Sequence, residues 1–302
     1  MTEPNPASQD RDAETNPVPA SQRAHPHDHN LEKDPALFRR EPVSFVRRGA
    51  RLNRSRQGAW DRMADTVLVP VPRDRADTSV ARDAVFDWTQ IFGRPGRMLV
   101  DIGCGQGEST AQGAADRPDW NVLAVEVYVP GLAGLMGLAE RGELTNIRAV
   151  EANAPEVLDH LLPAGGVDEV WVFFPDPWHK SRHHKRRLVS PAFADRLARV
   201  LAPGGLIRLA TDWSDYAVQM RTVFESDERF ENLHPGERAG THSPLTRVRA
   251  EGLEKQEPLP AEDALDAEGG WSPRFAGRPL TSFEAKSQKA GRLVFDLTYR
   301  RV

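Results

Sequence analysis

The stretch Val100-Asp101-Ile102-Gly103-Cys104-Gly105-Gln106-Gly107-Glu108 decides the fold class. An apolar run ends in the acid Asp101, and a glycine-rich turn with the spacing G-x-G-x-G follows at once. Glycine lets a backbone approach a ligand closely, and such a turn between a strand and a helix is typical of nucleotide-binding α/β folds. The stretch therefore predicts a strand, a ligand-binding turn that includes Gly103 and Gly105, and a helix that follows.

Apolar runs and helical segments alternate beyond this turn. We expect strands at 98–102, 122–127, 147–150, 170–174 and 206–210, and helices near 108–117, 130–141, 154–162 and 191–201. Strands that alternate with helices predict βαβ units and a mostly parallel sheet. Ser190 before Pro191 signals a helix start, and the alternating run 292–299 predicts a late strand near the sheet edge.

Composition divides the 302-residue chain into three parts. Residues 1–38 are polar and cannot bury enough apolar surface to offset their ordering entropy, so we expect a disordered tail. Residues 39–90 mix basic and apolar residues, which predicts an extension packed on an α/β domain at 91–302. Glycine, proline and charge concentrate at about 234–280, where we expect an irregular insertion.

Cysteine usage and hydropathy bear on location. Cys104 is the single cysteine, which rules out an internal disulfide and fits a reducing compartment. No apolar stretch has the length of a membrane span or resembles a secretory signal. The sequence therefore predicts a cytoplasmic protein with no membrane partner.

The net charge of −4 is unevenly spread. Residues 251–268 hold seven acidic side chains against one lysine, whereas 180–187 and 39–56 are strongly basic. Local charge matters more than the sum for nucleic-acid binding, so this net charge does not exclude a nucleic-acid partner.

Two acids at strand ends indicate the ligand of the glycine turn. Asp101 would repel a pyrophosphate, and it would attract a cationic ligand that carries an ammonium or sulfonium group. Glu126 ends the second strand, where an acid commonly receives a ribose diol. Together they predict S-adenosyl-L-methionine as the cofactor, and a dehydrogenase-like or ligand-free α/β fold is the alternative.

Residues 173–187 read Phe-Phe-Pro-Asp-Pro-Trp-His-Lys-Ser-Arg-His-His-Lys-Arg-Arg. The prolines end a strand and stiffen the backbone around Asp176, and a basic run follows. A carboxylate beside an aromatic ring can recognise a nucleobase, and clustered cations can hold a phosphate backbone. The alternative, a turn followed by a solvated charge run, explains the rigid Pro-Asp-Pro-Trp poorly. The histidines lack further ligands at zinc spacing, so we predict no metal site.

From about Ser44 to the C-terminus the chain resembles the bacterial tRNA (guanine-N7-)-methyltransferases, class I methyltransferases that modify guanine 46 in the tRNA variable loop. The resemblance rests on residues 44–48 (Ser-Phe-Val-Arg-Arg), the glycine turn, 125–127 (Val-Glu-Val), 173–187, 211–213 (Thr-Asp-Trp) and 281–284 (Thr-Ser-Phe-Glu). It implies a Rossmann-like α/β fold with a mostly parallel seven-stranded sheet, helices on both faces and a late antiparallel strand.

The resemblance also implies roles for individual residues. Donor contacts would come from Asp101, Gly103, Gly105, Glu126, Asn153 and Asp176, and Asp176 would be the catalytic acid. Substrate contacts would come from Lys180, Asp212, Thr281, Ser282, Phe283 and Glu284, and RNA contacts from Arg182, His183, His184, Lys185, Arg186 and Arg187. Asn153 departs from the family pattern because an aspartate is common there, and the tail and the insertion are longer than that pattern requires.

The chemistry of guanine supports the same roles. N7 carries a lone pair and no proton, so methyl transfer needs alignment and electrostatic support rather than a general base. Asp176 suits an acceptor for guanine N1–H, and Asp212 is a plausible second acceptor. The structural alternatives are a turn-shaping role for Asp176, a helix cap for Asp212 and a capping box at Thr281 and Glu284.

Other functions are weighed against this one. A methyltransferase acting on another RNA, a protein or a small molecule would share the glycine turn, but a protein or small-molecule enzyme would have no use for the basic run at 180–187. A non-catalytic RNA-binding protein would be expected to have lost Asp101, Glu126 or Asp176, and all three are present. With tRNA as the expected partner, the sequence leaves monomer and homodimer open.

Overall fold

The computed structural model describes residues 51–74, 76–236, 269–290 and 292–302. The expected tail at 1–38, most of the basic stretch at 39–56 and the acidic run at 251–268 lie outside these residues. All described residues belong to one compact unit, Lys33–Val302.

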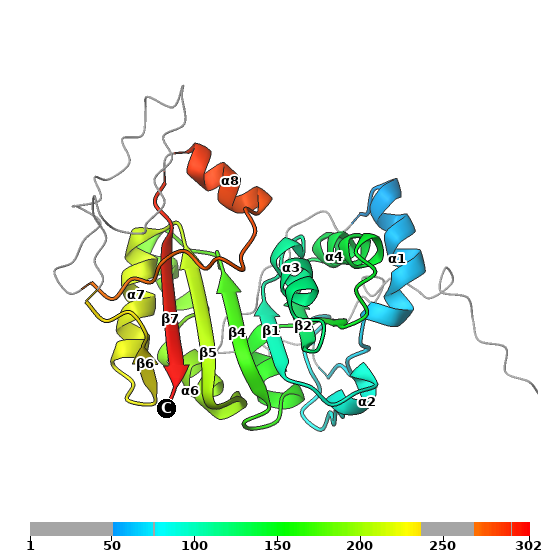
Figure 1. The fold of residues 1–302 in the computed structure, drawn as a ribbon, viewed down its shortest axis with the longest axis horizontal. Helices are drawn as coiled ribbons and strands as arrows, with labels where there is room; N and C mark the ends of the chain where they lie inside the picture. Colours follow the sequence, from blue (N-terminus) through cyan, green and yellow to red (C-terminus); the bar gives the residue numbers. More distant parts are fainter. Residues whose placement is uncertain (1–50, 75, 237–268, 291) are drawn as a thin grey trace, which may run out of the picture. The chain divides into compact units, whose positions relative to one another are not determined.

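In the described part of the chain, seven strands form one sheet in the order β3-β2-β1-β4-β5-β7-β6 (Figure 1). The strands β1 to β5 pair in parallel, and β7 pairs antiparallel with β5 and β6. Their bounds are β1 Met98–Ile102, β2 Asn121–Glu126, β3 Ile147–Glu151, β4 Val167–Phe173, β5 Leu201–Thr211, β6 Phe230–Asn232 and β7 Phe295–Arg301. The expected class I methyltransferase arrangement is confirmed, with β7 one strand from the edge because β6 pairs outside it.

The helices follow the expected βαβ pattern. They are α1 Arg54–Val67, α2 Trp88–Phe92, α3 Glu108–Asp116, α4 Val129–Arg141, α5 Ala154–Glu156, α6 Pro191–Val200, α7 Ser214–Glu225 and α8 Ser282–Lys289. The helix expected at 154–162 begins as α5 and continues as a π-helical turn, Val157–Leu161. Ser190 caps α6 by accepting from the Phe193 N–H, as its position before Pro191 predicts.

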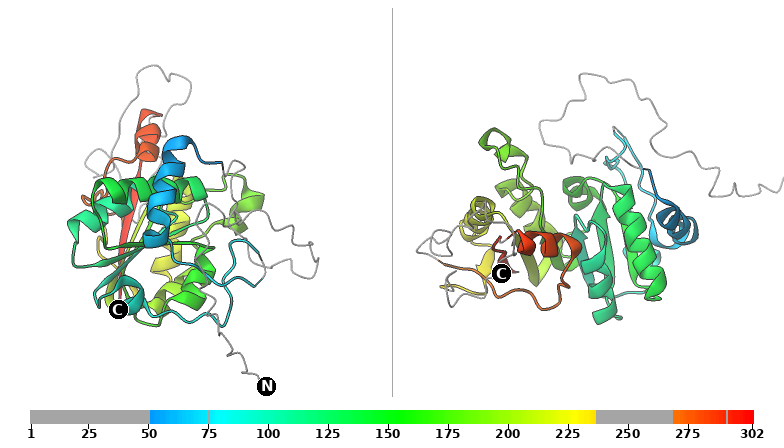
Figure 2. Two further views of the ribbon diagram at one scale, coloured as in Figure 1. Left: turned by 90° about the vertical axis from the view of Figure 1, so that its right-hand side faces the viewer. Right: turned by 90° about the horizontal axis from the view of Figure 1, so that it is seen from above.

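Two apolar clusters fill the two faces of the sheet. One joins alternate residues of β1 to β3, such as Leu99, Ala124 and Ala149, to apolar residues of α1, α3 and α4. The other joins the opposite face to α2, α6, α7 and the π-helical turn. The two views of Figure 2 show helices on both sides of the sheet. Since side chains alternate along a strand, Asp101 and Glu126 belong to the face covered by α3 and α4.

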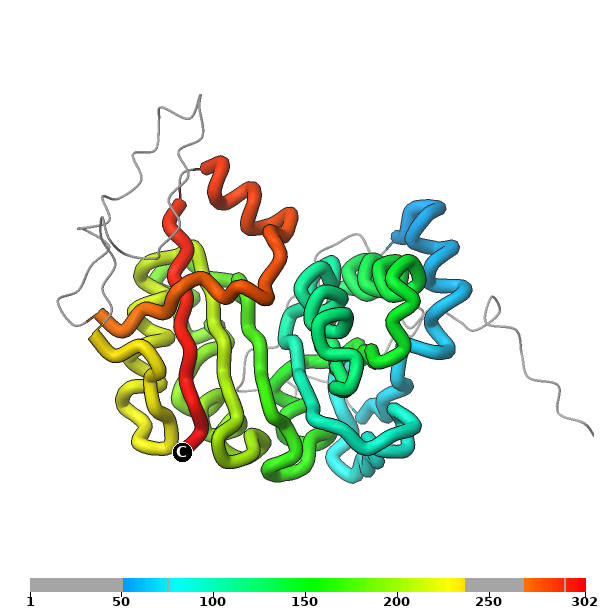
Figure 3. The backbone as a smooth tube through the Cα atoms, viewed as in Figure 1, coloured from blue at the N-terminus to red at the C-terminus, as the bar shows by residue number. Residues whose placement is uncertain are grey.

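An irregular segment, residues 271–281, crosses the sheet face over β7, β5 and β4 before it reaches α8 (Figure 3). Ser272 bridges Asp296 of β7, the Arg208 guanidinium of β5 lies over the Phe275 ring, and that ring packs on Trp171 of β4. This segment is the described end of the expected insertion. It delivers α8 to the end of the sheet where the parallel strands finish.

The strand order reverses between β1 and β4, because the chain proceeds from β1 through β2 and β3 on one side and from β4 through β5 on the other. In open α/β sheets, ligands bind outside the carboxyl ends of the strands at this switch point. The glycine turn follows β1 and the Pro-Asp-Pro turn follows β4, so both motifs flank the switch point.

Candidate active site

The glycine turn has one face toward open space and one packed against α4. Gly103, Gly105 and Gly107 all have positive φ angles, 74°, 57° and 80°, which favour glycine. A Cβ on Gly103 would meet no heavy atom of the described chain within 4 Å, whereas one on Gly107 would lie 2.5 Å from the Leu135 side chain. Gly131 of α4 also must lack a Cβ, because the Gly105 carbonyl would be 2.2 Å away. The glycine turn therefore packs tightly against α4 on one face, and its other face, at Gly103, is open.

The side chain of Asp101 lies inside the protein. Its side chain is buried and accepts a hydrogen bond from Thr110 Oγ1 at 2.6 Å. Burial raises the pKa of the carboxyl to about 7, and the charge of Glu126 adds to the rise while the Thr110 bond opposes it. The group is therefore poised between its two protonation states near neutral pH.

Glu126 holds the glycine turn and the start of α4 in place. One carboxylate oxygen accepts from the Gly105 N–H at 2.9 Å, and the other accepts from the N–H groups of Val127 and Tyr128 at 2.7 and 3.0 Å. Burial raises its pKa against these three bonds, and the charge of Asp176 contributes to the rise. The negative charge of Asp176, in the turn after β4, thus disfavours ionisation of Glu126 at the end of β2.

Asn153 lies just beyond β3 and is buried. Its backbone N–H donates to the Thr78 carbonyl at 2.7 Å, and its side-chain amide contacts the Glu156 carboxylate at 3.4 Å. Glu156 in turn accepts from the Val80 N–H at 2.8 Å. The residues between α1 and α2 thus pack against this end of the sheet and fix Asn153 outside the end of β3.

Asp176 is exposed in a turn of unusual backbone geometry. Phe174 and Trp178, two residues to either side, have φ angles of 54° and 43°, a region that costs energy for residues with a Cβ. Pro175 and Pro177 fix the backbone around the aspartate. Backbone strain of this kind clusters at functional sites and persists only where the surrounding structure holds it.

The basic loop that follows contains a 3-10 helix, Ser181–Arg186, and its side chains differ in exposure. Lys180, Arg182 and Lys185 are exposed. The Arg186 guanidinium lies 5.0 Å from the Trp178 ring centre. His183 is partly buried beside Trp178, and His184 Nε2 is 3.6 Å from the Asp215 carboxylate.

Arg187 differs from its neighbours, and its expected RNA contact needs correction. Its side chain is 2% exposed and donates to the Asp215 carboxylate, the Gln219 side chain and the Pro177 carbonyl at 2.7–2.8 Å. A buried guanidinium with three internal partners is not presented to an RNA phosphate. Sequence alone counted it with the surface cations because its neighbours are basic.

Asp212 directly follows β5, and its carboxylate is hydrogen-bonded to side chains of the protein itself. One carboxylate oxygen accepts from Ser287 Oγ at 2.7 Å and from Arg292 at 2.9 Å. Ser287 belongs to α8, so Asp212 ties this helix to the end of β5. It makes no side-chain cap at the start of α7, where Trp213 holds the N-cap position.

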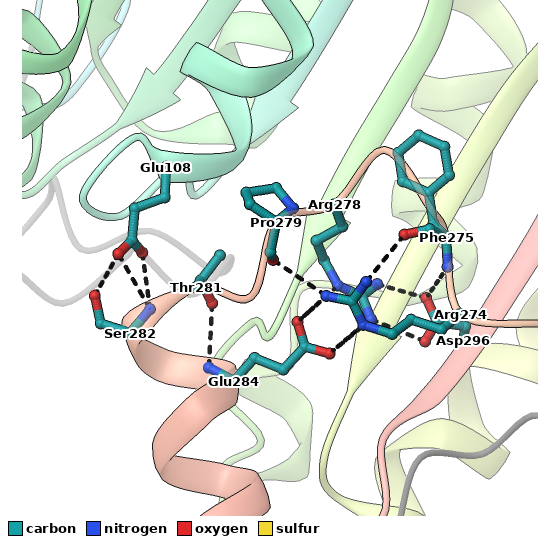
Figure 4. A network of polar contacts seen from close by, with 9 residues as sticks. All are labelled: Glu108, Arg274, Phe275, Arg278, Pro279, Thr281, Ser282, Glu284 and Asp296. Carbon is teal, nitrogen blue, oxygen red and sulfur yellow. Dashed lines mark hydrogen bonds and ion pairs between the residues drawn. The ribbon is translucent and has the colours of Figure 1, made fainter.

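The segment Thr281–Glu284 starts α8 (Figure 4). Thr281 is the N-cap and accepts from the Glu284 N–H at 3.1 Å, which confirms half of the expected capping box. The Glu284 carboxylate does not complete the box. It is fully buried and receives two bonds at 2.8 Å from Arg274 and two at 3.2 Å from Arg278. Arg278 also pairs with Asp296 of β7.

Phe283 and Ser282 lie in the same turn of α8 as Glu284 but have other partners. Phe283 is 50% exposed, and its ring lies 5.1 Å from that of Phe174. The Ser282 N–H donates to both carboxylate oxygens of Glu108 at 3.1 Å, and its hydroxyl bonds the same carboxylate. Sequence reasoning missed Glu108, because an acid in the first turn of a helix has an ordinary explanation in the helix dipole. It also missed Thr110 and Phe174, for which the sequence gives no signal.

Within the described ranges, no group of three or more histidine, cysteine, aspartate or glutamate side chains could hold a metal ion. The same part of the chain contains no helix long and apolar enough to cross a membrane.

Comparison with known proteins gives the family. A family model described as a putative methyltransferase matches residues 95–297. The tRNA (guanine-N(7)-)-methyltransferase of Arthrobacter sp. (strain FB24) is 53% identical over an alignment of 276 residues, and the match covers 86% of this chain and 86% of that protein. The chain belongs to the tRNA (guanine-N(7)-)-methyltransferase family.

Further members of the tRNA (guanine-N(7)-)-methyltransferase family agree. The protein of Paenarthrobacter aurescens (strain TC1) is 52% identical and covers 86% of this chain and 91% of its own. That of Burkholderia thailandensis is 35% identical, with coverages of 94% and 91%. A solved 16S rRNA methyltransferase, KamB, is 17% identical with a TM-score of 0.45, covering 71% of this chain and 92% of its own, and this likeness adds nothing to the assignment.

Proposed function

We propose that this protein transfers the methyl group of S-adenosyl-L-methionine to N7 of a guanosine in tRNA, at position 46 of the variable loop. One observation carries the proposal. Asp176 is an exposed carboxylate in the turn after β4, on one side of the switch point, and the glycine turn after β1 lies on the other side. A base-recognising carboxylate and a donor turn on opposite sides of one switch point suit transfer between two bound ligands.

The donor side fits S-adenosyl-L-methionine. The open face of Gly103 and Gly105 leaves room for a ligand close to the backbone. Glu126 ends β2 and Asn153 follows β3, where the ribose and the adenine would be held. Asp101 supplies a carboxylate for the amino-acid end of the donor, acting from beneath the turn. When bound, the donor supplies a methyl group on a positively charged sulfur.

The acceptor side fits guanine. Asp176 would accept hydrogen bonds from guanine N1–H and the exocyclic amine, which orients N7 without removing a proton. Positive charge develops on the purine as N7 is methylated, so a fixed carboxylate becomes a better partner as the reaction proceeds. Phe283, half exposed against Phe174, offers an aromatic surface for the base.

The exposed cations of the basic loop would hold the tRNA backbone. Lys180, Arg182 and Lys185 lie within ten residues of Asp176 and are exposed. Phosphate contacts of this kind position an RNA without reading its sequence. They favour a nucleic-acid substrate over a small molecule or a free protein.

The experiment is incubation of the protein with unmodified bulk tRNA and isotope-labelled S-adenosyl-L-methionine, followed by nucleoside mass analysis. We expect labelled 7-methylguanosine, and mass analysis of oligonucleotide fragments of the same tRNA should place it at position 46. Label in a different nucleoside, in protein or in small molecules would reject the proposal, as would the absence of any transfer. Glu228→Gln, a change at an exposed glutamate after α7, serves as the control variant and should behave as the wild type.

A further inference from the structure

Glu108 and Ser282 lie at the start of two helices that flank the switch point. Glu108 is the first residue of α3, directly after the glycine turn, and Ser282 is the first residue of α8. The Glu108 carboxylate accepts from the Ser282 N–H with both oxygens at 3.1 Å and from the Ser282 hydroxyl (Figure 4). Glu108 lies in the first turn of α3, and its carboxylate binds a backbone N–H at the start of α8, where backbone N–H groups lack intrahelical partners.

The other described contacts of α8 lie on the opposite side of the switch point. Glu284 is held by Arg274 and Arg278, and Arg278 is bound to Asp296 of β7. Ser287 bonds Asp212 after β5, and Phe283 packs on Phe174 after β4. Among the hydrogen bonds of the described residues, Glu108 is therefore the partner of α8 on the β1 side.

We propose that Glu108 is a positioning residue, which sets the distance and orientation of α8 relative to the glycine turn and so aligns the acceptor base with the donor. The proposal rests on the proposed function, because it takes the turn as the donor site and α8 as part of the acceptor site. Methyl transfer requires an in-line arrangement of N7, the methyl group and sulfur, and small misplacements cost rate steeply. A direct hydrogen bond between α3 and α8 fixes the two halves of the site relative to one another and so limits such misplacement.

The chemistry of the contact suits this role. A carboxylate that accepts from a backbone N–H at a helix start makes a charge-assisted bond, stronger and shorter than a neutral one. Ser282→Ala leaves the backbone N–H of Ser282 in place, so Glu108 is the side to change. Glutamine keeps an acceptor oxygen at the same reach and loses the charge, whereas alanine removes the contact.

The test compares Glu108→Ala, Glu108→Gln and the control Glu228→Gln. S-adenosylhomocysteine affinity is measured by calorimetry and tRNA affinity by filter binding. The rate of 7-methylguanosine formation is measured in single turnover, with enzyme in saturating excess over tRNA and with saturating donor. We expect the single-turnover rate of Glu108→Ala to fall by about 10- to 100-fold. Both affinities and the melting temperature should match those of the wild type, and Glu108→Gln should recover part of the rate.

A double variant separates positioning from direct contact. If the two side chains act through one bond, Glu108→Ala with Ser282→Ala should be no slower than Glu108→Ala alone. Additive losses would mean that Ser282 acts on the RNA by itself, and the proposal would fail. It would also fail if Glu108→Ala kept the wild-type rate, or if its rate loss were matched by a loss of S-adenosylhomocysteine affinity. If the wild type formed no 7-methylguanosine, the proposed function itself would be wrong.

Discussion

Arg187 donates a hydrogen bond to the Asp215 carboxylate at 2.7 Å from a guanidinium that is almost completely buried. Its remaining N–H groups bind Gln219 of α7 and the Pro177 carbonyl, next to Asp176. Arg187 thus fastens the turn that carries Asp176 to α7. The last arginine of a basic run is a structural anchor, whereas Arg182 and Lys185 face water.

The first prediction follows from this anchor. Arg187→Lys keeps the charge but loses the forked geometry that reaches three partners, so the turn around Asp176 should loosen. We expect a lower melting temperature and a slower methyl transfer, with an unchanged salt dependence of tRNA binding. Arg187→Ala removes the charge as well, and a flatter salt dependence with normal stability in that variant would instead show that Arg187 contacts phosphate.

The second prediction concerns the exposed cations. Replacing Arg182 and Lys185 together by alanine should weaken binding to every tRNA tested without changing S-adenosylhomocysteine affinity. Each lost phosphate contact lowers the slope of log affinity against log salt by roughly 0.7 to 0.9, so the slope should flatten by about one and a half units. Filter binding between low and moderate salt measures it. A wild-type slope in the double variant would mean that both side chains merely face solvent.

The third prediction concerns Asp101 and pH. Because burial raises its pKa to about 7, the carboxyl is largely protonated at pH 6 and ionised at pH 8. If the ionised form holds the donor, S-adenosylhomocysteine affinity should fall as the pH drops through about 7. Calorimetry across this range checks it, and Asp101→Asn should bind weakly at every pH.

Asp101 also links pH to stability. Its folded pKa lies above the unfolded value, so ionisation is harder in the folded state and the group costs stability once the pH passes the unfolded value. This loss of folding stability reaches its full size once the pH exceeds the folded pKa of about 7. Asp101→Asn should therefore unfold at a higher temperature than the wild type at pH 8 and show little difference at pH 4. An equal gain at both pH values would contradict the raised pKa.

The fourth prediction concerns Asp176. Asp176→Asn keeps the size of the side chain and loses the charge and part of the acceptor capacity, so both kcat and kcat/KM should fall. S-adenosylhomocysteine affinity and the melting temperature should be retained, because the side chain is exposed. Normal turnover would return Asp176 to a purely turn-shaping role.

The fifth prediction separates structure from recognition at Glu284. Burial works against its ionisation, yet hydrogen bonds from Arg274 and Arg278 hold the pKa of Glu284 below its usual value. Glu284→Gln removes a negative charge from beside the buried Arg278 and the partly exposed Arg274, which should cost about 3–5 kcal/mol of unfolding free energy. Urea unfolding measures this loss, with Glu228→Gln as the exposed control. A variant of full stability that fails to bind tRNA would assign Glu284 to the substrate instead.

The sequence was a good guide to the order of elements. β1 lies where its apolar run predicts, and α3 and α4 begin within a residue of the expected positions, because strand and helix periodicities are local properties. The π-helical turn after α5 and the short strand β6 were not expected. Their backbone geometry is set by packing on the sheet rather than by the residues themselves.

The sequence by itself determined the family, the parallel sheet and the residue types that surround the switch point, since these depend on short motifs and on local periodicity. The tertiary structure alone decided which of those residues remain free to act. Arg187 and Glu284 are buried with charged or polar partners, whereas Asp176 stays exposed. Glu108 meets Ser282 across 174 residues. The physical reason is that burial, hydrogen-bond pairing and the resulting pKa depend on neighbours brought together by folding, which a linear sequence does not display.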